Sequence, residues 1–94
     1  MLLEKFTVTD KMGIHARPAT KLVQAANKFK SNIHLGFEET KVNMKSITGI
    51  MTLGITEGMI IEVMTEGEDE RKAFQALCEL MERESIGVSV KAIS

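Results

Sequence analysis

The segment Gly13-Ile-His-Ala-Arg-Pro-Ala-Thr20 places a nucleophilic histidine two residues before an arginine. The imidazole of His15 offers a nitrogen lone pair that can take up an electrophile, and the Arg17 guanidinium is a fork of donors suited to phosphate oxygens. Pro18 fits a first helical turn, so His15 should lie at a helix mouth, where free N–H groups and the helix dipole attract anions. The spacing therefore indicates a histidine that can carry an anionic group. A plainer alternative is that His15 only caps the helix and Arg17 is a solvated side chain.

A second segment, Lys45-Ser-Ile47, begins a short apolar helical pattern. Serine is a favoured N-cap residue, and Ile47, Ile50 and Met51 should lie on one side of the helix that follows. Ser46 is thus either a cap alone or a cap whose hydroxyl is also modified. Apolar residues one turn apart, such as Ile47 and Met51, are by default buried against a sheet.

Hydrophobic periodicity predicts the elements that must position these residues. Alternating apolar residues predict four strands, and apolar residues at three- and four-residue steps predict three helices. The strands are expected at 2–8, 33–37, 42–44 and 59–65, and the helices at 16–28, from Ser46 and from Glu68. The order β-α-β-β-α-β-α is typical of an α+β fold, a two-layer open-faced sandwich with three helices on one face of a four-stranded antiparallel sheet.

Several element boundaries follow from single residues. Proline disfavours helical geometry in the preceding residue, so this rule alone would start the first helix at Pro18, a residue or two after the apolar pattern begins at residue 16. Glu38-Glu39-Thr40 lacks glycine and asparagine and predicts a long or loose hairpin connection. Gly87 is expected to stop the last helix, which leaves Val88 to Ser94 as a tail without predicted structure.

Composition excludes several classes of protein. The chain has 94 residues and a formal charge of −1, which fits one domain spanning 1–94 and no nucleic-acid partner. No apolar run approaches the roughly 20 residues that span a bilayer, and the N-terminus lacks a signal-peptide pattern, so we expect no membrane insertion. A single cysteine, Cys78, forms no internal disulfide and suits the cytoplasm.

The remaining titratable residues predict no further chemistry. His34 lies between inward Ile33 and Leu35, so it should face solvent and be inert. Two histidines and one cysteine have no metal-ligand spacing, and Cys78 is expected to be a partly buried apolar residue. The acidic run from Glu66 to Glu70 is interpreted as a helix-start cluster rather than a cation site.

Further short motifs accompany the histidine segment. They are Leu22-Val-Gln-Ala-Ala26, Val42-Asn43, Lys45-Ser-Ile47, Gly49-Ile-Met51, Leu53-Gly-Ile55 and Gly67-Glu-Asp-Glu70. In this order they resemble HPr, the histidine-containing phosphocarrier of the bacterial phosphoenolpyruvate-dependent sugar phosphotransferase system, over residues 2–86.

The resemblance implies a relay role for His15. It implies that His15 accepts a phosphoryl group through its δ nitrogen from enzyme I and passes it to IIA components of sugar permeases. Arg17 matches the arginine beside the phosphate, no cofactor is implied, and we expect a monomer. The resemblance further implies the sheet order 1-4-2-3. It also implies an apolar docking patch, formed by Ala16, Thr20, Ile47 and Met51.

The block around Ser46 resembles that of HPr from low-GC Gram-positive bacteria. This implies that Ser46 is phosphorylated by the HPr kinase/phosphorylase. The family's Ser-phosphorylated form binds a catabolite-control transcription regulator and accepts phosphate poorly from enzyme I. Phosphorylation would add about −1.5 to −2 charges at a helix N-terminus, which the fold tolerates.

Three positions depart from the family pattern, and two other functions remain open. The departures are the Glu38-Glu39 turn, Thr48 where many relatives have a large apolar residue, and the tail from Val88 to Ser94. An HPr-like paralogue with a regulatory or nitrogen-related role would share the same site chemistry. A family relative devoted to catabolite repression lacks the histidine, so His15 favours a carrier. A ferredoxin-like binding module or RNA-recognition domain fits poorly, because aromatics make up 4% of the chain and no basic excess exists.

Overall fold

The structure is a computed structural model that describes residues 1–93. Its strands and helices form where the sequence shows alternating and helical apolar patterns. The elements are β1 Leu2–Val8, α1 Ala16–Ala26, β2 Asn32–Phe37, β3 Thr40–Asn43, α2 Ile47–Thr52, β4 Ile60–Glu66, α3 Glu70–Arg83, β5 Gly87–Ser89 and a final 3-10 turn, η1, Val90–Ile93. The expected α+β class and order are confirmed, with β5 and η1 added at the end.

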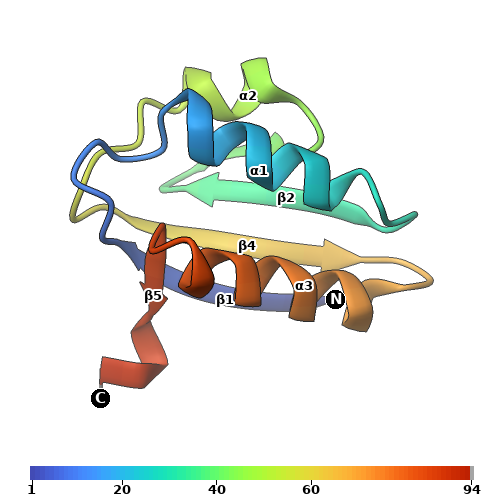
Figure 1. The fold of residues 1–94 in the computed structure, drawn as a ribbon. Coiled ribbons are helices and arrows are strands. Elements are labelled where there is room, and N and C mark those ends of the chain that lie inside the picture. Colours follow the sequence, from blue (N-terminus) through green and yellow to red (C-terminus); the bar gives the residue numbers. More distant parts are fainter. Residues whose placement is uncertain (94) are drawn as a thin grey trace.

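The strands form one antiparallel sheet in the order β3-β2-β4-β1-β5. The four expected strands therefore have the order 1-4-2-3 implied by the family resemblance. The short β5 is a fifth strand on the outer edge of β1, which the sequence did not predict. Figure 1 shows α1 and α3 side by side over one face of the sheet, with α2 beyond α1.

The core lies between this face and the helices. Every second residue of β4 points inward, so that Ile61, Val63 and Thr65 are buried while Ile60 is exposed. Helix α1 contributes the stripe predicted from its three- and four-residue steps, and α3 does the same. The helical core residues are Ala19, Leu22, Val23, Ala26, Ala73, Leu77, Leu80 and Met81.

Among residues 1–93, no α-helix covers the opposite face of the sheet. His34 pairs with Met64 of β4 on this face and is only half-buried, while its neighbours Ile33 and Leu35 are buried on the helix side. The predicted orientation of His34, away from the core, is confirmed.

Helix α1 begins two residues before the position that the proline rule predicts. Ala16 is the first helical residue, and Pro18 is the third. The start at Ala16 agrees with the apolar pattern from residue 16, and the proline rule alone is two residues late. The first N–H groups of a helix need no intrahelical acceptor, so proline fits any of the first three positions.

The connection between β2 and β3 is tight, contrary to the expected long or loose turn. Phe37 pairs with Thr40, which leaves only Glu38 and Glu39 in the turn. Glu38 adopts a φ of 54°, the left-handed conformation that glycine or asparagine usually supplies. The sheet register thus imposes a strained backbone on a glutamate.

The chain leaves α3 earlier than the glycine rule predicts. Arg83 is the last helical residue, and Ser85 takes the positive φ, 55°, that Gly87 was expected to supply. Gly87 instead lies in β5 opposite Val8, where a Cβ atom would come within 2.9 Å of the Thr7 carbonyl oxygen. The tail, for which the sequence predicts no structure, forms the end of β5 and the η1 turn over residues 88–93, and Ser94 lies outside the described residues.

Candidate functional site

The loop between β1 and α1 places His15 at one end of the molecule. Gly13 donates its N–H to the Asp10 carbonyl at 2.9 Å, and Met12 donates its N–H to Asp10 Oδ1 at 2.9 Å. Gly13 has a φ of 68°, and a Cβ there would lie 2.1 Å from the Ile55 carbonyl oxygen. Only glycine fits this close approach to the α2–β4 loop, which runs beside the β1–α1 loop in Figure 1.

His15 is the N-cap residue of α1, but its side chain makes no capping hydrogen bond. Its carbonyl accepts the first helical hydrogen bond, from the Ala19 N–H at 3.1 Å. The N–H groups of Ala16 and Arg17 precede this bond and face the helix end, where they favour an anion. The imidazole is 32% exposed. A partner can therefore reach the imidazole.

Charged side chains surround the imidazole. A cavity of about 130 Å³ is lined by Asp10, His15, Arg17, Pro18, Lys21 and Glu84. Lys21 forms an ion pair with Glu84, and this hydrogen bond is the main reason that the pKa of the Glu84 carboxyl lies below its usual range. The cavity thus holds two cations and two carboxylates around one histidine.

Sequence reasoning found two of the residues in this cavity and missed the others. His15 and Arg17 were predicted, and the structure brings them together. Asp10, Lys21 and Glu84 were not singled out. The position of Lys21 on the same helix face as Arg17, four residues on, was a usable signal. Glu84 follows α3, and only the folded chain brings it to His15.

The apolar docking patch is on the surface, as the family resemblance implies. Ile47 is 43% exposed and Met51 42%, whereas Ile50 between them is buried. Their spacing in the helix keeps Ile47, Ile50 and Met51 on one side, as predicted. The default of burial is wrong for Ile47 and Met51 and right for Ile50. Ala16 is exposed, and Thr20 is half-buried with its hydroxyl donated to the Ala16 carbonyl at 2.8 Å.

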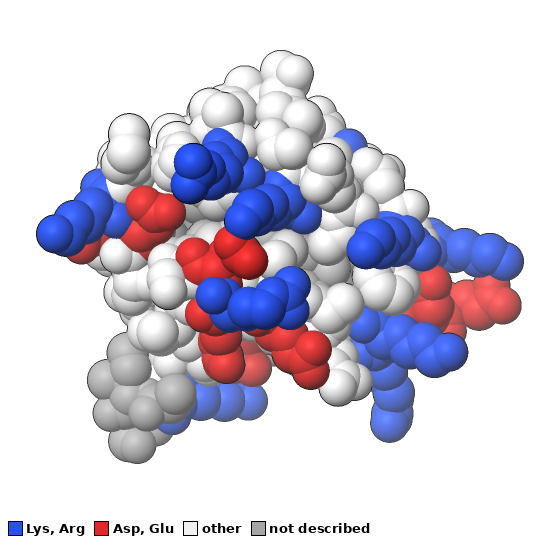
Figure 2. All heavy atoms as spheres, in the orientation of Figure 1, with Lys and Arg blue, Asp and Glu red and all other residues white. Residues whose placement is uncertain are grey.

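The surface around α2 lacks charge. Figure 2 shows a region without lysine, arginine, aspartate or glutamate at the top of the view, over α2, while charged side chains gather below it. Met12, in the loop before His15, is 72% exposed and was not predicted as a contact residue. Thr48 is exposed on α2, so a threonine adds little apolar area there.

Ser46 caps α2. Its Oγ accepts a hydrogen bond from the Gly49 N–H at 3.0 Å, as the sequence predicts for an N-cap serine. The side chain is half-buried and does not line the cavity around His15. Ser46 and His15 therefore belong to two separate local structures, each at the N-terminus of a helix.

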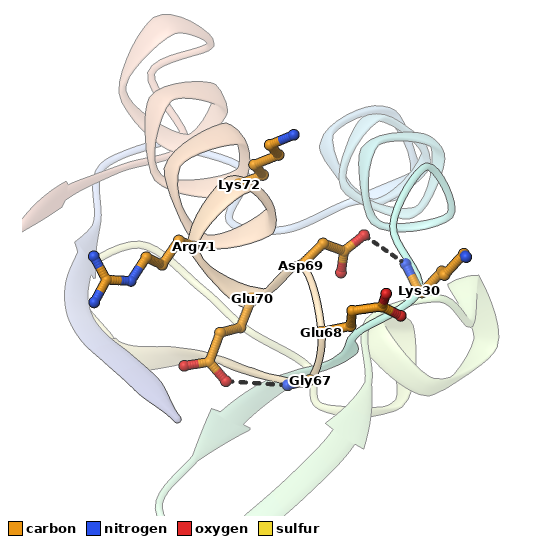
Figure 3. Close-up of a pocket in the computed structure, with 7 residues that line it drawn as sticks. All are labelled: Lys30, Gly67, Glu68, Asp69, Glu70, Arg71 and Lys72. Carbon is orange, nitrogen blue, oxygen red and sulfur yellow. Dashed lines mark hydrogen bonds between the residues drawn. The ribbon is translucent and has the colours of Figure 1, made fainter.

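A larger hollow, of about 640 Å³, lies at the start of α3 and is drawn in Figure 3. Two of its three acidic residues bond to the protein itself: Asp69 accepts from the Lys30 N–H at 3.0 Å, and Glu70 accepts from the Gly67 N–H at 3.1 Å. These carboxylates hold the β4–α3 turn, in agreement with the helix-start interpretation. We therefore assign the site to His15, where a nucleophile is present.

The other reactive groups of the described residues give no competing site. Burial raises the pKa of the Cys78 thiol to about 12, so the thiol stays protonated, and its predicted partial burial is confirmed. Within residues 1–93, no cluster of three or more histidine, cysteine or acidic side chains could hold a metal ion. None of the helices described is both long and apolar enough to cross a membrane.

Comparisons with known proteins identify relatives of this chain. A family model described as the PTS HPr component phosphorylation site matches residues 3–83. A phosphocarrier protein HPr from Xylella fastidiosa (strain Temecula1) is 50% identical over 82 residues, which are 87% of this chain and 92% of that protein.

Two solved structures extend the comparison. The histidine-containing phosphocarrier protein of Mycoplasma is 36% identical with a TM-score of 0.89, over 92% of this chain and 98% of that one. Bacillus subtilis Crh, a catabolite repression protein, is 40% identical with a TM-score of 0.70, over 79% and 85% of the two chains.

Proposed function

Because this chain belongs to the HPr family of phosphocarrier proteins, we propose that His15 accepts a phosphoryl group from phospho-enzyme I and passes it to IIA components of sugar permeases. The observation that carries the proposal is a solvent-accessible imidazole at a helix mouth, beside amide donors and Arg17. In the first step a lone pair of His15 Nδ1 forms the bond to phosphorus, and the bond from phosphorus to enzyme I breaks with its electrons left on enzyme I. In the second step an acceptor atom of the IIA component forms the bond to phosphorus, and the bond between phosphorus and Nδ1 breaks with its electrons returning to Nδ1.

The protein supplies charge compensation and needs no cofactor for this step. The incoming group places negative charge at the positive end of α1, where the Ala16 and Arg17 amides can donate to its oxygens. The Arg17 side chain is exposed and lines the same cavity, so it can follow the group as it moves between two proteins. The chain acts as a covalent carrier within a relay, and we place that relay in the cytoplasm.

We assign partner contact to the apolar docking patch. Ile47 and Met51 are exposed on α2, which contains no charged residue, and Ala16 and Thr20 lie in the first two turns of the neighbouring helix α1. Partly exposed apolar side chains next to a reactive group are typical of a surface that partners recognise in turn. We propose that one HPr-like domain acts as a monomer and presents this same surface to enzyme I and to the IIA components.

Incubation with enzyme I and phosphoenolpyruvate tests the carrier function. We expect mass spectrometry to show one added phosphoryl group, acid-labile and alkali-stable, on His15. The His15→Ala variant should remain unlabelled, and His34→Ala should be labelled like the parent chain because His34 lies on the helix-free face of the sheet. Labelling of the His15→Ala variant would refute the assignment. A panel of IIA acceptors would separate a sugar carrier from a paralogue with a regulatory or nitrogen-related role.

We further propose that Ser46 is phosphorylated by an HPr kinase/phosphorylase and that the modified protein binds a catabolite-control transcription regulator. The support is local: the Ser46 hydroxyl caps α2, immediately before exposed Ile47. A phosphoryl group there would add about −1.5 to −2 charges beside the apolar docking patch. It could repel an acidic partner without unfolding the helix, because a helix N-terminus favours negative charge.

The Ser46→Asp variant tests this regulation. We expect about tenfold slower charging by enzyme I, because about 1.4 kcal/mol of like-charge repulsion corresponds to a factor of ten. Ser46→Ala removes the hydroxyl without adding charge and is the matched control. Steady-state charging rates at equal enzyme I concentration give the comparison. Equal rates for the aspartate variant and the parent chain would exclude an inhibitory role for charge at Ser46.

A further inference from the structure

One carboxylate of the cavity is directed at the imidazole. Asp10 Oδ2 lies 3.6 Å from His15 Nε2. The other carboxylate oxygen, Oδ1, accepts the Met12 N–H at 2.9 Å, and the Asp10 carbonyl accepts the Gly13 N–H at 2.9 Å. The turn therefore fixes the side chain, with one oxygen used in the backbone and the other facing the ring.

The remaining charged groups of the cavity do not take this role. Glu84 is held in an ion pair with Lys21 and has Arg83 Nε at 3.9 Å from its second oxygen. Arg17 and Lys21 carry donors only and cannot accept a ring proton. Asp10 is thus the acceptor that the cavity offers to Nε2.

We propose that Asp10 is a positioning residue that keeps the ring proton of His15 on Nε2 and leaves the lone pair of Nδ1 for phosphorus. The inference rests on the proposed carrier function. A carboxylate beside a ring nitrogen attracts an N–H and repels a lone pair, and such a partner commonly fixes which tautomer a histidine adopts. The separation of 3.6 Å suits a charge contact that shortens when the ring becomes positive, as hydrogen bonds in resting sites often do.

The proton count of the transfer is consistent with this arrangement. When Nδ1 bonds to phosphorus, Nε2 keeps its proton, and the ring gains a positive charge that Asp10 offsets. When the group leaves for the next acceptor, the electrons of the nitrogen–phosphorus bond return to Nδ1, and the proton is still on Nε2. Neither step requires a proton to leave or join the ring, so the exchange can proceed at a protein interface without a separate base.

The Asp10→Asn variant tests the inference, because asparagine keeps Oδ1 for the Met12 N–H and replaces the oxygen facing the ring by an NH₂ donor. The tautomer of His15 can be measured by nitrogen-15 NMR of the unphosphorylated protein at about pH 9. The parent chain should show mainly the Nε2–H form, and Asp10→Asn should shift toward Nδ1–H. Glu84→Gln removes a negative charge from the same cavity and should leave the tautomer unchanged.

Charging kinetics complete the test. If the Nε2–H tautomer falls to about a tenth of the population, kcat for charging by enzyme I should fall about tenfold. KM should change little, because Asp10 is not part of the apolar docking patch. A parent chain with mainly Nδ1–H, an unshifted tautomer in Asp10→Asn, or a shifted tautomer with unchanged kcat would each overturn the inference. The NMR measurement needs no phosphorylation, so it separates this inference from the carrier proposal.

Discussion

A phosphoryl group on His15 would bring close to two negative charges into a cavity that already contains the carboxylates of Asp10 and Glu84. Lys21 is committed to Glu84, so its charge is already largely balanced. Arg17 is therefore the cation best placed to compensate the new charge. Its donors are exposed and can also reach the group as it passes to a second protein.

Replacement of Arg17 by glutamine should slow transfer without preventing it. A hydrogen bond to a charged group contributes about 1.5–3 kcal/mol, so kcat/KM for charging should fall by about 10- to 100-fold. Arg17→Lys keeps the charge but loses the forked pair of donors, so its kcat/KM should lie between those of Arg17→Gln and the parent chain. Arg71→Gln, on an exposed position of α3, is the control. Equal rates for Arg17→Gln and the parent chain would mean that the helix-end amides compensate the charge alone.

The sequence could predict that His15 and Arg17 lie close together, because both are at the start of one helix and their proximity does not depend on the rest of the fold. Ser46 could be predicted as a cap for the same reason, and the bond to the Gly49 N–H confirms it. Asp10 was not recognised, because its approach to His15 depends on the turn closed by Gly13. Local spacing predicts side chains on one element, whereas contacts across a loop depend on backbone geometry.

At the scale of elements, Asp69 joins α3 to the start of β2. Its carboxylate accepts the Lys30 N–H at 3.0 Å (Figure 3). It also accepts the Ser31 N–H at 2.9 Å and the Ser31 hydroxyl. The Ser31 hydroxyl is the main reason that the pKa of Asp69 is lowered from 3.8 to about 2. The ionised carboxylate thus fixes the entry of β2 beside the N-terminus of α3.

The stability that Asp69 contributes by joining α3 to β2 should fall at acidic pH. Because the pKa of Asp69 is lower in the folded than in the unfolded chain, its stabilising effect is present above 3.8 and is lost as pH falls through about 2. Asp69→Asn should therefore lower the urea midpoint at pH 7, and the difference from the parent chain should vanish near pH 2. Glu68→Gln is the control, since Glu68 is exposed in the same segment. A pH-independent difference would exclude the charge of Asp69 as the cause.

Periodicity predicted elements better than it predicted their ends. The strand at 2–8 is confirmed to the residue, because Phe6 and Val8 alternate with polar neighbours over a buried face. The β2–β3 turn was missed because pairing of Phe37 with Thr40 forces Glu38 into a left-handed conformation that its own propensity disfavours. Sheet register, a property of several strands together, overrode the local preference.

At the scale of the whole molecule, the C-terminal segment returns to the site. The Ile86 carbonyl accepts the Thr9 N–H at 2.9 Å and the Asp10 N–H at 3.4 Å, and Thr9 Oγ1 donates to the Ser85 carbonyl at 3.3 Å. β5 then pairs with β1 (Figure 1). The segment after α3 therefore supports the loop that leads to His15. No pattern near residue 86 predicts this, because its partners lie more than seventy residues away in the sequence.

Ile86→Ala should affect both the stability and the site. Ile86 is fully buried, so its truncation should cost about 2–5 kcal/mol of unfolding free energy. The loss should also loosen the loop, because the Ile86 carbonyl anchors Thr9 and Asp10. Hydrogen exchange at the amides of Thr9 and Asp10 should accelerate more than exchange in β2, which is separated from β1 by β4 in the sheet.

Val88→Ala is the matched control, because Val88 lies in the same segment but is exposed. Its unfolding free energy should stay within about 0.5 kcal/mol of the parent value. Hydrogen exchange at Thr9 and Asp10 should not change. If Ile86→Ala destabilises the protein while exchange in the loop rises only as much as in β2, the segment fills the core without supporting the site. A selective rise in the loop would instead show that the end of the chain holds Asp10, and through it the ring of His15, in place.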